Sequence, residues 1–197
     1  MYTLNIAAIQ QQIIIFVILF ATASLSVSCA EEEETLYFTG SSLVEKWDVR
    51  KYFPTRITYN MGLSGSGIEY IESQGSMFQG ESVVVITGGN DLASINDLDE
   101  YADRYLQVLC NMQANHIYLF SILPRLAFED DGYKKVRMLN AKIKERINSQ
   151  MDRIIYIDIF ERMLKDGNLN ENMFYDGTHL NNWGYTLISE ELNKVLL

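Results

Sequence analysis

Residues 83–91 read Val-Val-Val-Ile-Thr-Gly-Gly-Asn-Asp, an apolar run that passes directly into glycines and polar residues. A continuous apolar run of this length, without alternation, is typical of a strand buried on both faces, as in a parallel sheet. Glycine favours turns, so the strand should end near Gly88. The stretch therefore predicts a central parallel strand with a polar loop at its carboxyl end.

Four further runs rich in β-branched and aromatic residues predict strands at residues 36–38, 57–59, 117–120 and 154–157. Apolar residues at helical spacing predict three later helices with core-facing stripes. The stripes contain Leu98, Tyr101, Ala102, Tyr105, Leu109 and Met112, then Val136, Leu139, Ile143 and Ile147, and last Tyr185, Ile188, Leu192 and Val195. This alternation predicts an α/β fold, a three-layer α/β/α sandwich with a central parallel sheet.

Charge and metal-ligand content argue against several functions. The 197 residues include 16 Lys and Arg against 26 Asp and Glu, a net charge of −10. Nucleic-acid phosphates are bound mainly by Lys and Arg, so nucleic acid is not an expected partner. Two His and two Cys are too few for most zinc sites. We therefore expect neither a metal nor a cofactor.

Residues 1–29 have the composition of an export signal. They contain no Asp, Glu, Lys or Arg, and the apolar block 13–21 is followed by small residues and then by Cys29. Residues 13–30 are also long enough, at the lower limit, for an uncleaved membrane anchor, which stays an alternative. We expect an exported protein with one domain at residues 30–197.

Cys29 is a candidate for lipid attachment. Residues 25–29, Leu-Ser-Val-Ser-Cys, resemble a bacterial lipobox, and Ala30 followed by four Glu resembles the export tag of some surface lipoproteins. This resemblance implies a bacterial cell-envelope location, with a lipid anchor at the outer membrane or cell surface as the only membrane contact. Cys110 would then lack a disulfide partner, and we expect it to be buried on a helix.

Polar loops follow the predicted strands or precede the last helix, where ligands of such sheets bind. They are Thr39-Gly40-Ser41-Ser42, Asn60-Met61-Gly62, Gly88-Gly89-Asn90-Asp91 and Asp176-Gly177-Thr178-His179. Hydrolysis by a serine needs a base, a group that orients the base, and donors for the oxyanion. The four loops contain each of these parts.

The better candidate for the base is His179. The other histidine, His116, stands just before a predicted strand, at the edge opposite the expected site. Asp176 lies three residues before His179 in a loop that contains glycine, so its carboxylate can fold back onto the imidazole. Asn90 follows a buried strand, where its amide can donate to a developing negative charge.

Taken in order, these loops resemble the sequence blocks of the SGNH hydrolase superfamily, the GDSL-type esterases, over residues 38–185. Gly40-Ser41-Ser42-Leu43 is similar to the first block, and Ser41 replaces its commoner Asp. The resemblance implies that Ser42 is the nucleophile and that Asp176 and His179 complete a triad. It also implies an oxyanion hole formed by Ser42, Gly62 and Asn90. From spacing alone, Ser41 and Ser42 are equivalent candidates.

The resemblance further implies a flavodoxin-like fold and a carboxylic ester hydrolase. Together with the export signal, it favours short acyl esters, O-acetyl groups above all, carried by carbohydrates. Two other functions use the same sequence features: a surface carbohydrate-binding lipoprotein without catalysis, and an acyltransferase that passes the acyl group to a sugar hydroxyl.

Overall fold

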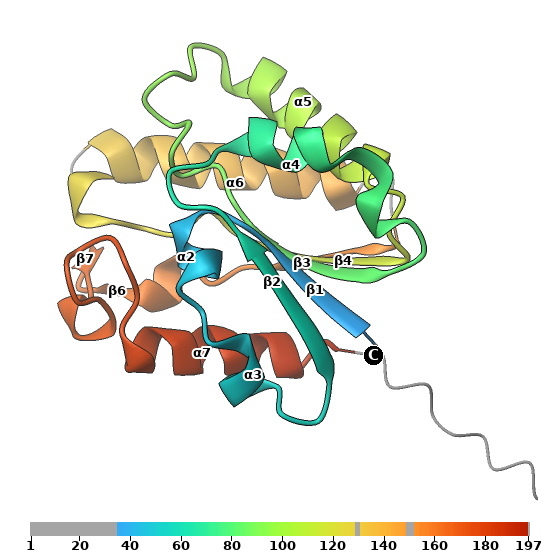
Figure 1. The fold of residues 1–197 in the computed structure, drawn as a ribbon. Helices are drawn as coiled ribbons and strands as arrows, with labels where there is room; N and C mark the ends of the chain where they lie inside the picture. Colours follow the sequence, from blue (N-terminus) through green and yellow to red (C-terminus); the bar gives the residue numbers. More distant parts are fainter. Residues whose placement is uncertain (1–34, 129–130, 149–151, 197) are drawn as a thin grey trace, which may run out of the picture. The chain divides into compact units, whose positions relative to one another are not determined.

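The computed structural model describes residues 35–128, 131–148 and 152–196 (Figure 1). The predicted export segment at residues 1–29, the alternative anchor and Cys29 lie outside this part. None of the helices in the described residues is long and apolar enough to cross a membrane.

Five parallel strands form the central sheet, in the order β2-β1-β3-β4-β5. They are β1 (Thr35–Gly40), β2 (Ile57–Gly62), β3 (Ser82–Ile86), β4 (His116–Phe120) and β5 (Ile154–Ile157). Each of the five apolar runs lies within one of these strands. The order 2-1-3-4-5 is that of flavodoxin-like sheets, so the predicted fold is confirmed.

Helices cover both faces of the sheet (Figure 1). On one face lie α4 (Ile68–Gln74), α5 (Leu98–Asn111) and α6 (Asp131–Asn148), and on the other lie α3 (Val49–Tyr52) and α7 (Asn182–Asn193). The short α2 (Ser42–Glu45) directly follows the first strand. Single turns of 3₁₀ helix are η1 (Gly75–Phe78), η2 (Leu126–Phe128), η3 (Glu161–Met163) and η4 (Glu171–Met173), and β6 (Leu164–Lys165) pairs with β7 (Asn168–Leu169).

The sheet divides the interior into two hydrophobic cores. Successive side chains of a strand point to opposite faces. Accordingly, Val83 and Val85 pack with α5 and α6, whereas Val84 and Ile86 pack with α7. All four are buried, which explains why this strand is apolar at every position rather than at every second one.

Strand register brings the functional loops together at one edge. Gly40, the last residue of β1, pairs with Gly62 of β2 and with Ile86 of β3. Gly40 has a φ of +145°, and a Cβ there would lie 2.0 Å from the Ile86 carbonyl oxygen. Only glycine fits this close approach. The N–H of Ser41 then donates to the same carbonyl at 3.1 Å.

Cys110 lies on α5, as expected, and it forms no disulfide bond among the described residues. It is half-buried rather than fully buried. The apolar stripe of α5 runs through Tyr105, Leu109 and Met112, which are buried in the core, and Cys110 lies beside that stripe.

Candidate active site

Ser42 is the first residue of α2 and lies two positions after Gly40, where β1 passes close to the Ile86 carbonyl. The N–H of a helix's first residue has no helical partner, and that of Ser42 has no acceptor among residues 35–128, 131–148 and 152–196. At the other end of α2, the Asn60 side chain donates to the carbonyls of Val44 at 2.7 Å and Trp47 at 2.9 Å. These contacts hold the Ser42 hydroxyl at the carboxyl edge of the sheet.

The loop before α7 presents a histidine and a carboxylate to Ser42. Asp176 Oδ1 accepts the backbone N–H groups of Thr178 at 3.0 Å and His179 at 2.7 Å. The Nδ1–H of His179 donates to Asp176 Oδ2 at 2.7 Å. With this proton on Nδ1, Nε2 is the acceptor, and it lies 3.0 Å from Ser42 Oγ. The structure thus joins three predicted residues in one hydrogen-bonded chain.

The carboxylate of Asp176 is held in its ionised form. The hydrogen bond from the His179 ring, with those from the two backbone N–H groups, lowers the pKa of Asp176 to about 2. The Tyr175 ring stacks on the imidazole, with 5.7 Å between centroids and 17° between planes. The imidazole is therefore oriented by the carboxylate on its edge and by an aromatic ring on its face.

Asn90 is held at both ends of its side-chain amide. Its Nδ2 donates to the carbonyl of Ser66 at 2.8 Å, and its Oδ1 accepts from Arg125 Nη1 at 3.2 Å. Arginine has no acceptor, so the orientation of the amide is unambiguous. Ser66 accepts one of the two N–H groups on Nδ2, and the second has no acceptor in the described part of the chain.

The prediction for Gly62 needs correction. Its N–H donates to Asn60 Oδ1 at 2.9 Å, an Asx turn in which a side chain takes the amide two residues later. The turn that follows is anchored on Gly40, whose carbonyl accepts from Leu63 N–H at 2.9 Å and Ser66 Oγ at 3.1 Å. Within this turn, the Gly65 N–H has no hydrogen-bond partner among the described residues.

The second histidine, His116, lies at the edge of the sheet opposite the one that carries Ser42. His116 is the first residue of β4, at the amino end, whereas Ser42 follows the carboxyl end of β1. This position agrees with the sequence argument that His179 is the histidine near the serine.

These positions all fall within the region where this chain matches a known family. The model of the GDSL-like Lipase/Acylhydrolase family matches residues 37–187. The chain belongs to the GDSL-like lipase/acylhydrolase family. The resemblance to SGNH hydrolases is therefore confirmed, and family membership places the chain among SGNH-type ester hydrolases.

Relatives of this GDSL-like chain include one curated protein and several solved structures. The N-acylneuraminate cytidylyltransferase of Escherichia coli O18:K1:H7 (strain RS218 / NMEC) is 31% identical over 169 residues, covering 80% of this chain but 39% of the relative. The chain thus spans about two-fifths of that protein.

Two solved structures share the fold at low sequence identity. A GDSL-like lipase from Bacteroides thetaiotaomicron VPI-5482 has a TM-score of 0.68 at 20% identity, covering 89% of this chain and 94% of that one. A lipase/acylhydrolase from Enterococcus faecalis has a TM-score of 0.63 at 16% identity, covering 82% and 94%. At these identities the likeness shows the fold alone.

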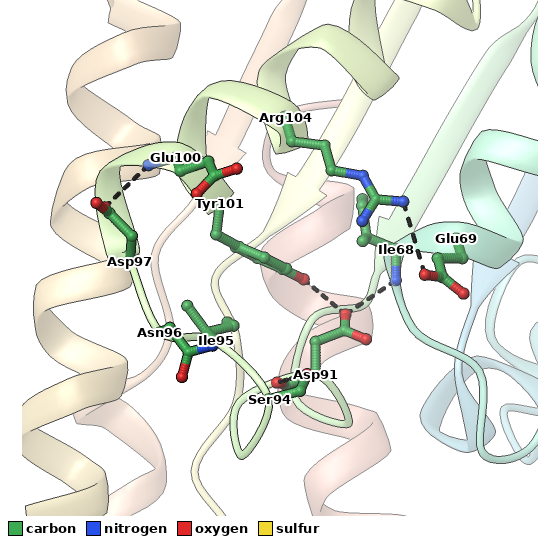
Figure 2. A pocket seen from close by; sticks show the side chains of 10 residues that line it. All are labelled: Ile68, Glu69, Asp91, Ser94, Ile95, Asn96, Asp97, Glu100, Tyr101 and Arg104. Atoms are coloured by element: carbon green, nitrogen blue, oxygen red, sulfur yellow. Dashed lines mark hydrogen bonds and ion pairs between the residues drawn. The ribbon is translucent and has the colours of Figure 1, made fainter.

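One residue of the GDSL-like site that sequence reasoning left without a role is Asp91. Its Oδ2 accepts the Ile68 N–H at 2.9 Å and the Tyr101 hydroxyl at 2.6 Å (Figure 2). Burial raises the pKa of Tyr101, so this phenol is a neutral donor. Asp91 thereby ties the Asn90 loop to the start of α4 and to α5. In the sequence, the position of Asp91 directly after Asn90 was the one feature that could have pointed to this supporting role.

Figure 2 also shows the polar pocket that surrounds Asp91, with a volume of about 270 Å³. Its lining includes the carboxylates of Glu69, Asp97 and Glu100 and the guanidinium of Arg104, which lies 3.8 Å from Glu69. Asp97 is engaged as the N-cap of α5, where it accepts from two backbone N–H groups, and Arg104 pairs with Glu72 at 2.6 Å. The pocket therefore lies between α4, α5 and the loop that carries Asn90, and no member of the triad lines it.

Proposed function

We propose that this protein is a serine esterase that removes short acyl groups, acetyl above all, from carbohydrate hydroxyls through an acyl-enzyme on Ser42. The observation that carries this proposal is the chain of two hydrogen bonds from Asp176 through His179 to Ser42 Oγ, 2.7 and 3.0 Å long. Such a chain converts a weakly nucleophilic hydroxyl into an attacking oxygen.

Each partner has a defined role in the reaction. His179 Nε2 takes the Ser42 proton while Oγ attacks the ester carbonyl carbon, and Asp176 stabilises the imidazolium that forms. The tetrahedral intermediate collapses, and His179 returns the proton to the departing sugar oxygen. Water, deprotonated by the same imidazole, then attacks the acyl-enzyme and releases the carboxylic acid.

The developing oxyanion needs donors that are free in the resting site. The Ser42 N–H and the second N–H of Asn90 Nδ2 meet this requirement. In place of Gly62, whose N–H serves the Asn60 side chain, we propose the Gly65 N–H as the third donor. It belongs to the turn that is anchored both on Gly40 and, through Ser66, on Asn90.

A small, partly enclosed cavity favours acetyl as the acyl group. Three of its lining residues adjoin members of the site: Leu43 follows Ser42, Gly89 precedes Asn90, and Thr178 precedes His179. The remaining walls are Ile86, Thr87, Ile122, Leu123, Pro124 and Arg125. Its volume of about 10 Å³ holds one group the size of water. A methyl group has this size, so the cavity suits an acetyl group better than a longer acyl chain.

An open groove that includes Tyr175, the residue stacked on His179, suits a sugar as the alcohol. It has a volume of about 490 Å³ and is lined by tyrosines, including Tyr175, and by Lys46 and Asn181. Tyr175 exposes 58% of its surface. Aromatic faces with polar neighbours suit a sugar ring. The name of the curated relative, which gives an N-acylneuraminate as its substrate, also favours a sugar.

The proposed function is tested with p-nitrophenyl acetate and with acetylated sugars, comparing wild type with Ser42→Ala. We expect acetate release by wild type only. Equal background rates for both proteins would overturn catalysis and favour the carbohydrate-binding alternative. Addition of unmodified acceptor sugars, with analysis of the products, separates hydrolysis from acyl transfer, because a transferase would yield a newly acetylated sugar.

We also propose, on the sequence alone, that the protein is exported and anchored through a lipid on Cys29. Metabolic labelling with a radioactive fatty acid tests this assignment. Label should enter wild type and not Cys29→Ala. Label in neither protein would contradict the assignment.

A further inference from the structure

Arg125 is a cation without an anionic partner beside the proposed site. It follows β4 through a short loop, and its Nη1 donates to Asn90 Oδ1 at 3.2 Å. Its guanidinium carbon lies 4.5 Å from the centroid of the Phe128 ring. None of the carboxylates in the described residues pairs with it. By contrast, carboxylates pair with Arg104, Arg137, Arg146 and Arg162.

Keeping an unpaired cation partly buried is costly. Burial lowers the pKa of the Arg125 guanidinium from its ordinary value, because desolvation disfavours the charged form. The contacts with the Asn90 amide oxygen and the Phe128 ring compensate only part of the hydration free energy that burial removes. In a chain with net charge −10, a surface carboxylate would be an easy partner. The contacts that Arg125 does make, with Asn90 Oδ1 and with the Phe128 ring, therefore indicate its role.

The backbone next to Asn90 is shaped to admit this guanidinium. A Cβ on Gly89 would lie 2.3 Å from Arg125 Nη2, well inside van der Waals contact. Glycine at position 89 therefore lets the cation pack directly against the residue before Asn90. Arg125 also forms part of the wall of the small acyl cavity, so its charge lies at the side of the site where the oxyanion forms.

The contact with Asn90 has two physical effects. A donor without acceptor capacity fixes Oδ1 toward Arg125 and thus Nδ2 toward Ser66 and the site. A charged donor on the oxygen also polarises the amide and strengthens the N–H groups at its other end. Both effects favour the oxyanion more than the neutral ester, which is the requirement for raising kcat.

We propose that Arg125 is a positioning residue of the oxyanion hole that acts through Asn90, an inference that rests on the proposed ester hydrolysis. It aims the Asn90 amide and strengthens it as a donor, and Gly89 provides the space. Arg125 itself does not contact the ester.

A double-mutant cycle on p-nitrophenyl acetate tests this role with Arg125→Met, Asn90→Ala and the double variant. Met keeps most of the side-chain volume and removes the charge. We expect Arg125→Met to lower kcat about 10-fold with KM changed less than about 2-fold, and Asn90→Ala to lower kcat about 10²- to 10³-fold. The double variant should match Asn90→Ala within about 2-fold, because Arg125 acts through the amide that is missing.

The control is Arg137→Met, which removes an exposed arginine that pairs with Glu161, and it should leave kcat unchanged. If the effects of Arg125→Met and Asn90→Ala multiply in the double variant, or if Arg125→Met raises only KM, the role is refuted. Should Arg125→Met fail to fold, Arg125→Lys takes its place in the same cycle, with a smaller loss of kcat expected. An inactive wild type would instead refute the proposed function.

Discussion

His179 Nε2 and Ser42 Oγ lie 3.0 Å apart although 137 positions separate the two residues in the chain. The contact joins the loop after the first strand to the loop before the last helix. Two elements at opposite ends of the domain must therefore dock correctly before the serine has a base. Activity therefore requires the whole domain to fold, because only the folded domain brings His179 Nε2 next to Ser42 Oγ.

Replacing the serine separates the two adjacent candidates for nucleophile. Ser42→Ala should lower kcat/KM for p-nitrophenyl acetate about 10⁴-fold or more, because it removes the attacking oxygen. Ser41→Ala is the matched control, since Ser41 is buried and its hydroxyl does not cap α2. It should retain activity within about 3-fold. A larger loss from Ser41→Ala than from Ser42→Ala would reverse the assignment.

Replacing the carboxylate that orients His179 should lower activity nearly as much as Ser42→Ala does. Asp176→Asn keeps the shape, but an amide cannot hold the same histidine tautomer or stabilise the imidazolium. We expect kcat to fall about 10³- to 10⁴-fold. The circular dichroism spectrum should stay unchanged, because the loop remains closed by the backbone bond from Tyr175 N–H to the His179 carbonyl, 3.0 Å long. Wild-type turnover in this variant would contradict the triad.

The pH dependence follows from the lowered pKa of Asp176, about 2. The carboxylate stays ionised throughout the working range, so the acid limb of kcat/KM should not report the titration of Asp176. For stability, a folded-state pKa below the unfolded one gives a contribution that is present above the unfolded value and is lost as the pH falls toward 2.

The corresponding measurement compares thermal unfolding midpoints of wild type and Asp176→Asn. The gap between them should narrow as the pH falls from about 5 toward the folded-state pKa of Asp176. A gap that widens on acidification would contradict the sign of the shift.

The size of the acyl cavity predicts strong discrimination by chain length. The p-nitrophenyl ester of butyrate should be hydrolysed at least about 10-fold more slowly than the acetate, since each methylene changes transition-state binding by about 1–3 kcal/mol. Leu123→Ala enlarges the cavity and should raise the butyrate-to-acetate ratio about 10-fold or more. Leu169→Ala, in the same core but outside the cavity, should leave the ratio unchanged. Equal rates for both esters in wild type would contradict acetyl selectivity.

A substitution in the core away from the site should affect stability alone. Leu109 of α5 is fully buried between the sheet and neighbouring helices, and Leu109→Ala should lower the free energy of unfolding by about 2–5 kcal/mol. Urea unfolding measures this change. The kcat of the folded fraction should match wild type, because none of the active-site contacts involves Leu109.

The sequence alone determined the layers, because burial of a strand on both faces requires apolar residues at every position. Val83 to Ile86 show this requirement directly, whereas the edge strand β2 exposes Ile57 and Tyr59 although its run is just as apolar. The stripes of α5, α6 and α7 follow from helical spacing in the same way. Short helices such as α2 and α4 have too few turns for a stripe, and the sequence pattern did not predict them.

The residue types of the site were also readable, because serine, histidine and aspartate in strand-end loops are chemically distinctive. The failure at Gly62 was local. An asparagine two residues before a glycine can take its amide in an Asx turn or leave it free, and the choice depends on where Asn60 finds acceptors for its own Nδ2. Those acceptors, the carbonyls of Val44 and Trp47, belong to another element.

Only the tertiary structure decided which groups meet. The Ser42 to His179 distance, the cavity beside Leu43 and the contact of Arg125 with Asn90 each join loops from different strands. Local propensity and periodicity describe neighbours along the chain, whereas these contacts depend on strand register and on how the loops cross the edge of the sheet. That edge is formed only when all five strands pair, so its chemistry is a property of the assembled sheet.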